Sequence, residues 1–108
     1  MRRVLFLCSR NKLRSPTAEQ IFSAHPDLEV ASAGLADDAD VPCTPELVKW
    51  ADIIFVMETA HRSKLSARFK RHLRRAHVVC LDIPDKFEFM DPALVRMLQA
   101  RVGRHLRS

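Results

Sequence analysis

A cysteine and an arginine that could act together on a phosphate group lie close to the N-terminus, in the pattern Cys-x5-Arg from Cys8 to Arg14. A cysteine is nucleophilic as the thiolate, and nearby positive charge favours that form. An arginine holds two oxygens of a phosphate at once and stays charged at every relevant pH. The spacing alone is weak evidence, because arginine is common in this sequence.

The segments on either side of this pair make the hypothesis specific. Residues 4–7 form a short apolar run, typical of a strand buried on both faces. Ser15-Pro16 predicts the start of a helix, with the serine as its cap. An anion bound between them would meet loop N–H groups and the positive end of the helix dipole. The predicted phosphate-binding loop comprises Ser9, Arg10, Asn11, Lys12, Leu13, Arg14 and Ser15.

Strand-like and helix-like segments alternate along the whole chain. Further strands are predicted at 28–33, 52–57 and 77–83. Helices are predicted at 15–25, 44–50, 59–75 with a possible break near Ser66, and 91–106. Alternation predicts an α/β fold, a three-layer sandwich with a four-stranded parallel sheet and helices on both faces. Ligands bind at the carboxyl ends of such strands, where Cys8 and Asp82 both fall.

Length and composition indicate an ordinary soluble protein. A chain of 108 residues with 47% hydrophobic and 29% charged residues is expected to form one domain, residues 1–108. No apolar run approaches the roughly 18 residues of a membrane helix. The N-terminal apolar run is too short for a signal peptide. We expect a cytoplasmic protein with no membrane partner.

The formal net charge of +5 is concentrated in residues 61–77. A basic surface favours anionic partners, such as phosphoproteins, nucleic acids or polyphosphates, but such a run is also typical of a solvated helix face. Its one aromatic residue, Phe69, argues against a platform for stacking bases, so nucleic acid is not expected as a partner.

The other two cysteines, Cys43 and Cys80, are not predicted to take part in catalysis. Three unevenly spaced cysteines predict neither a disulfide framework nor a zinc site. Cys80 lies within an apolar run and is expected in the core. Cys43 follows a polar loop and could be an exposed thiol.

The segment CSRNKLRSPTAE resembles the active-site loop of the low-molecular-weight protein tyrosine phosphatases, whose pattern is Cys-x-x-Asn-x-x-Arg-Ser-Pro-x-Ala-Glu. Three later segments are also similar to that family and follow in its order: ASAGL, ADIIFVME and VVCLDIPDKFEF. The resemblance therefore extends over nearly the whole chain.

This resemblance implies a role for each loop residue. Cys8 would be the nucleophile and Arg14 the phosphate clamp. Asn11 and Ser15 would fix the loop shape through side-chain hydrogen bonds, with Ser32 as a supporting partner. Ser15 would also stabilise the departing thiolate. The implied substrate is a phosphotyrosine protein or a small aryl phosphate, with no metal and no cofactor required.

The general acid has three candidate positions. The family carries it in an Asp-Pro pair after the fourth strand, whereas this chain reads Asp82-Ile83-Pro84-Asp85. We favour Asp82 by its place at the strand end, with Asp85 as the alternative. Asp91 stands in a literal Asp-Pro pair, which a helix cap explains better.

Three features depart from the family. The chain is about a third shorter than the usual member, mainly between residues 34 and 50, and Arg10 adds positive charge at the mouth of the loop. The chain also has no tyrosine, although the family flanks aromatic substrates with tyrosines. Phe87 and Phe89 could serve by stacking, or could pack onto the last helix.

Two other functions fit the same loop. One is arsenate reduction, which needs further cysteines near the nucleophile; only Cys43 could serve. The other is a phosphate-recognising interaction module that binds without turnover, with the basic helix docking an acidic partner.

Overall fold

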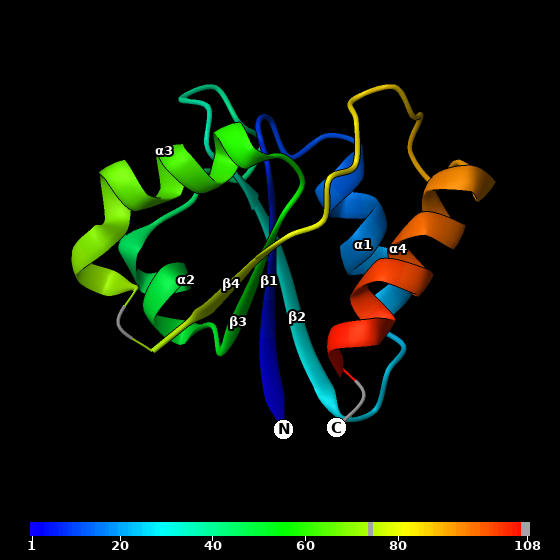
Figure 1. Cartoon of the computed structure of the whole chain (residues 1–108), viewed down its shortest axis with the longest axis horizontal. Helices are drawn as coiled ribbons and strands as arrows, with labels where there is room; N and C mark the ends of the chain where they lie inside the picture. Colours follow the sequence, from blue (N-terminus) through cyan, green and yellow to red (C-terminus); the bar gives the residue numbers. More distant parts are fainter. Residues whose placement is uncertain (74, 107–108) are drawn as a thin grey trace.

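The computed structural model describes residues 1–73 and 75–106. Its strands and helices alternate as the sequence predicts (Figure 1). The strands are β1 (Arg2–Cys8), β2 (Leu28–Gly34), β3 (Ile53–Val56) and β4 (His77–Cys80). The helices are α1 (Arg14–Phe22), α2 (Pro45–Trp50), α3 (Thr59–Phe69) and α4 (Pro92–Leu106), with a short 3-10 turn, η1 (Lys70–His72), after α3.

The four strands form one parallel sheet in the order β2-β1-β3-β4. The predicted fold class is therefore confirmed. Strand β1 lies in the middle, where Leu5 pairs with Ala31 on one side and with Ile54 on the other. Its residues 4–8 are all buried, as expected for a strand covered on both faces.

Helices cover both faces of the sheet, with α1 and α4 on one side and α2 and α3 on the other (Figure 1). Alternate residues of β1 point to opposite faces. Val4 and Phe6 pack in the core under α1 and α4, and Leu5 and Leu7 pack in the core under α2 and α3. Helix α4 buries a stripe at helical spacing, which comprises Leu94, Leu98 and Val102.

Two predicted boundaries are wrong. The helix predicted to reach residue 75 ends at Phe69, a buried core residue, and tightens into η1; it has no break at Ser66, and residue 74 lies outside the described residues. The fourth strand, predicted to reach residue 83, ends at Cys80. Asp82 has φ 54°, a left-handed conformation that interrupts an extended strand.

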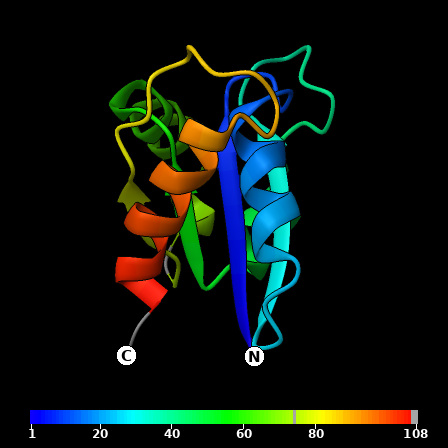
Figure 2. The ribbon, with the colours of Figure 1, turned by 90° about the vertical axis from the view of Figure 1, so that its right-hand side faces the viewer.

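The loops that follow β1, β2 and β4 gather at one end of the molecule, opposite the N-terminus (Figure 2). This is the carboxyl end of the parallel strands, where ligands bind in such sheets. In the described part of the chain, no helix is both long and apolar enough to span a membrane.

Candidate active site

Residues 9–13 link β1 to α1 in a loop in which three carbonyl groups accept backbone hydrogen bonds and the N–H groups of the described residues donate none. The carbonyls of Ser9, Arg10 and Leu13 accept backbone hydrogen bonds of 2.8, 3.0 and 3.1 Å. Among the described residues, none of the N–H groups of residues 9–13 donates a hydrogen bond to another group. Unpaired amides are rare because they are costly when buried. This group of donors is therefore free to bind an anion.

Gly34, at the end of β2, lets this loop lie close to the sheet. A Cβ atom at this position would lie 2.5 Å from the carbonyl oxygen of Ser9 and 2.6 Å from the Cβ of Ala39. Both contacts are too short for any side chain, so the glycine is required by close approach.

The buried amide of Asn11 fixes the shape of the loop. Its backbone has φ 59°, which asparagine tolerates better than most residues. Its Nδ2 atom donates to Ser15 Oγ at 3.0 Å and to Ser32 Oγ at 2.9 Å. The Ser32 hydroxyl then donates to Glu19 Oε1 at 2.6 Å. The structure thus joins Asn11, Ser15 and Ser32, as expected, and adds a carboxylate that the sequence did not predict.

Ser15 faces the thiol of Cys8 and does not cap the helix, so its prediction as a cap is wrong. Helix α1 begins at Arg14, and no side chain caps it. The Ser15 Oγ lies 3.0 Å from Cys8 Sγ. This oxygen accepts a hydrogen bond from Asn11 and lies 3.4 Å from the carbonyl oxygen of Ala33. Its single proton can therefore be donated either to that carbonyl or to a thiolate at Cys8.

The guanidinium of Arg14 is buried and held at one end. Its Nη1 atom donates to Glu58 Oε2 and to the carbonyl oxygen of Ile83, both at 2.7 Å. Its Nε atom lies 3.7 Å from Asp85 Oδ1. The side chain is 3% exposed. With Nη1 bound to protein acceptors, the Nε–Nη2 edge remains for a bidentate anion.

Cys8, Arg14 and Asp85 line one cavity of about 330 Å³, together with four residues of the loop. Arg10 and Lys12 make its mouth basic, and each forms an exposed ion pair, with Asp38 at 3.8 Å and with Asp40 at 3.0 Å. The lining residues are Cys8, Ser9, Arg10, Lys12, Leu13, Arg14 and Asp85.

Comparison with known proteins reveals similarity in structure. No protein-family model matches the sequence, and no curated protein matches it. Among solved structures, the YwlE arginine phosphatase from Geobacillus stearothermophilus is similar, with TM-score 0.77, 21% identity, and coverage of 98% of this chain and 93% of that one. Wzb from Vibrio vulnificus in complex with benzylphosphonate has TM-score 0.70, 25% identity, and coverage of 91% and 90%. SP-PTP, a low molecular weight protein tyrosine phosphatase from Streptococcus pyogenes, has TM-score 0.77, 18% identity, and coverage of 100% and 95%.

The fold is that of the low-molecular-weight protein tyrosine phosphatases. The resemblance inferred from the sequence is therefore confirmed at the level of the fold. Similarity at these levels of identity does not assign an activity, so the roles of individual residues depend on the geometry of the site.

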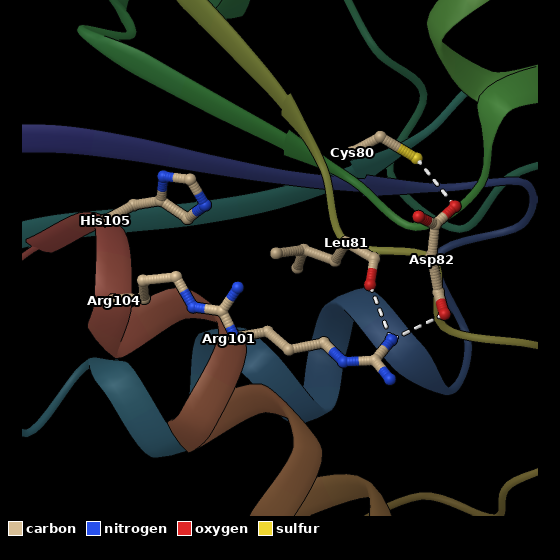
Figure 3. Close-up of a pocket in the computed structure, with 6 residues that line it drawn as sticks. All are labelled: Cys80, Leu81, Asp82, Arg101, Arg104 and His105. Carbon is tan, nitrogen blue, oxygen red and sulfur yellow. Dashed lines mark hydrogen bonds between the residues drawn. The ribbon is translucent and has the colours of Figure 1, made fainter.

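Within this phosphatase fold, Asp82 does not line the cavity that holds Cys8. Its carboxylate points towards Cys80, whose Sγ lies 3.5 Å from Asp82 Oδ1 (Figure 3). Asp82 lines two other hollows, one beside α4 and one beside Glu58. The left-handed backbone at Asp82 turns the chain at this point, and Asp85 reaches the cavity instead. Of the two candidate carboxylates, Asp85 is therefore the one that shares the cavity with Cys8.

The segment leading to Asp85 is held by arginines after it leaves the sheet. Arg101 Nη1, from α4, donates to the carbonyl oxygens of Leu81 and Asp82 at 2.7 and 2.6 Å (Figure 3). Arg14 binds the next carbonyl, that of Ile83. Three consecutive carbonyls are thus bound to guanidinium groups, which fix the path of the chain towards Asp85.

Two residues at the start of α3 were missed in the sequence. Glu58 binds Arg14, and His61 Nε2 lies 3.0 Å from Ser9 Oγ. In the sequence, His61 stands at the start of the basic stretch of residues 61–77. The available signal was that His61 follows closely after the carboxyl end of β3, on the side of the sheet where ligands bind.

The burial of Cys43 and Cys80 is the reverse of what the sequence predicts. Cys43 is buried in the core under α2 and α3, and burial raises the pKa of its thiol from 9.0 to about 11. Cys80 is only partly buried, because β4 is an edge strand. Burial also raises the pKa of the Cys80 thiol.

The aromatic and capping candidates are distinguished by burial and hydrogen bonding. Phe87 is buried in the core with α4, whereas Phe89 is 50% exposed; neither lines the cavity around Cys8.

Asp91 Oδ1 accepts a hydrogen bond from the N–H of Ala93 at 2.9 Å. Asp91 therefore acts as a helix cap, as the sequence predicts.

Proposed function

We propose that this protein is a phosphomonoesterase that works through a cysteinyl-phosphate intermediate. The observation that carries this proposal is the convergence of unpaired loop amides, the Cys8 thiol and one edge of the Arg14 guanidinium on a single cavity. Preorganised donors of this kind stabilise the charge on the equatorial oxygens of a transferring phosphoryl group.

In the first step, the Cys8 thiolate attacks phosphorus and the bond from phosphorus to the leaving oxygen breaks. Asp85 gives its proton to that oxygen. Arg14 leaves its ion pair with Asp85 to bind two phosphoryl oxygens. The freed carboxylate takes up a proton from water, and this is the proton that it passes to the leaving oxygen.

In the second step, water attacks the phosphorus of the intermediate and the phosphorus–sulfur bond breaks. Asp85, now a carboxylate, accepts a proton from this water. The Ser15 hydroxyl, 3.0 Å from the sulfur, stabilises the departing thiolate. The products are the free alcohol or phenol and inorganic phosphate.

We further propose phosphotyrosine as the substrate class, because a phenolate leaves more readily than an alkoxide. SP-PTP and Wzb share the fold, and Wzb binds benzylphosphonate. YwlE is an arginine phosphatase, so phosphoarginine is the competing substrate class that the assay must include.

The experiment is hydrolysis of phosphotyrosine, phenyl phosphate and phosphoarginine by the wild type, Cys8→Ser and Arg14→Lys. Turnover by the wild type and its loss in Cys8→Ser support the mechanism. Phosphate binding without turnover by the wild type would instead support a recognition module. Loss of thiol titre on addition of arsenate and a reductant-dependent cycle would support arsenate reduction.

A further inference from the structure

His61 is a buried histidine that the proposed mechanism does not use. It lies in the first turn of α3 and is 4% exposed. Both of its ring nitrogens have partners. The backbone N–H of Glu58 donates to His61 Nδ1 at 3.1 Å, and His61 Nε2 lies 3.0 Å from Ser9 Oγ.

These two contacts define the protonation of the ring. Because Nδ1 accepts a hydrogen bond, it carries no proton, and the proton of the neutral ring is on Nε2. Burial, followed by the charge of Arg14, lowers the pKa of His61. Lys64 acts in the same direction, while Glu58 and Asp85 oppose it. At neutral pH the Nε2–H group therefore donates to Ser9 Oγ.

This donation determines what the Ser9 hydroxyl can do. A serine hydroxyl has one proton to donate and two lone pairs that accept. His61 occupies one lone pair and cannot accept the proton of Ser9. Ser9 lines the same cavity as Cys8 and Arg14, so an anion in that cavity offers an acceptor for this proton.

We propose that His61 is a positioning residue that directs the proton of the Ser9 hydroxyl into the cavity, where it donates to a non-bridging oxygen of the bound phosphoryl group. This inference rests on the proposed function and adds to it a side-chain donor beside the loop amides and Arg14. A hydrogen bond donated to a charged oxygen stabilises more than a hydrogen bond between two neutral groups.

A competing role for His61 passes through Glu58. His61 binds the backbone of Glu58, whose carboxylate binds Arg14. Under that reading, removal of His61 would weaken the arginine clamp, and Ser9 would be irrelevant. A double-mutant cycle between His61 and Ser9 separates the two routes.

The cycle uses Ser9→Ala, His61→Ala and the double variant, with the exposed His77→Ala as the matched control. Inorganic phosphate affinity is measured by calorimetry, and kcat and KM are measured on phenyl phosphate. We expect Ser9→Ala and His61→Ala each to lower phosphate affinity about 10-fold or more. In the Ser9→Ala background, His61→Ala should change affinity by less than about twofold.

His61→Gln is the conservative variant. Its amide oxygen can accept from the N–H of Glu58, as in a capping box, and its NH2 group can donate to Ser9. We expect it to restore phosphate affinity relative to His61→Ala. Equal losses of phosphate affinity in His61→Gln and His61→Ala would overturn the proposal. Additive effects of Ser9→Ala and His61→Ala on phosphate affinity would also overturn it.

Nitrogen-15 NMR of the imidazole of the wild-type protein tests the tautomer without any variant. A proton on Nε2 at pH 7 is expected, and a proton on Nδ1 or a charged ring would overturn the proposal. The phosphate measurements do not require turnover. If the wild type binds phosphate without hydrolysing phenyl phosphate, the enzymatic function fails while the coupling of His61 to Ser9 is still decided.

Discussion

Arg14 Nε and Asp85 Oδ1 lie 3.7 Å apart, although Arg14 begins α1 and Asp85 lies far along the sequence, between β4 and α4. The pair places an exposed carboxyl group at the cavity that holds Cys8, while Arg14 itself is buried. A carboxyl group and a guanidinium group thus share one side of the cavity.

The first prediction concerns this carboxyl group. Asp85→Asn should lower kcat on phenyl phosphate about 10²- to 10⁴-fold, because general acid catalysis contributes about that much. The loss should be smaller with p-nitrophenyl phosphate, whose leaving group needs less protonation. Asp82→Asn, the matched control, should stay within about threefold of the wild type. A larger loss in Asp82→Asn than in Asp85→Asn would reverse the assignment.

The second prediction concerns the loop shape. Asn11→Ala removes two hydrogen bonds and places alanine at φ 59°. The free energy of unfolding, measured in urea, should fall by about 2–4 kcal/mol. The neighbouring Lys12→Ala breaks only an exposed ion pair and should have a small effect. Equal stabilities of the two variants would contradict this account.

The third prediction concerns Arg101. Arg101→Gln should loosen the segment that carries Asp85, so kcat on phenyl phosphate should fall several-fold while phosphate affinity stays the same. Arg104→Gln is the matched control, because Arg104 lies on the same helix and beside the same hollow (Figure 3). If Arg101→Gln and Arg104→Gln have the same kcat, Arg101 does not position the acid.

The fourth prediction follows from the pKa of Cys43, which burial raises from 9.0 to about 11. The unfolded thiol ionises near pH 9 while the folded thiol stays protonated. The unfolded state therefore binds fewer protons between these values, and folding stability falls as pH rises from 9 to 11. Cys43→Ala should lose roughly 2 kcal/mol less than the wild type over this range. Parallel stability curves would exclude Cys43 as the cause.

The fifth prediction follows from the lowered pKa of His61. The unfolded histidine binds a proton near pH 6.5, but the folded one remains neutral. Its contribution to stability is therefore present above pH 6.5 and is lost as pH falls through the lower folded value. Urea unfolding between pH 7 and pH 5 should show a shallower loss for His61→Gln than for the wild type. A steeper loss in the variant would show the opposite sign of the shift.

The sequence alone determined the parallel α/β fold and the loop from Cys8 to Ser15. Short apolar runs alternating with capped helices define parallel strands, because strands buried on both faces carry no polar positions. The candidate phosphate-binding residues could also be predicted from the sequence, since Cys8, Asn11 and Arg14 lie close together in the short segment that joins β1 to α1. The fold was recognisable for the same reason, as its loop pattern is short and contiguous.

Only the tertiary structure decided which distant side chains meet this loop. Glu19 and Ser32 meet at Asn11, His61 reaches Ser9 from another strand end, and Asp85 replaces Asp82 beside Arg14. The last choice depends on the left-handed backbone at Asp82 and on the carbonyls bound by Arg101. Spacing along a chain does not specify such a turn, because the backbone conformation there is set by contacts with a helix that comes later in the sequence.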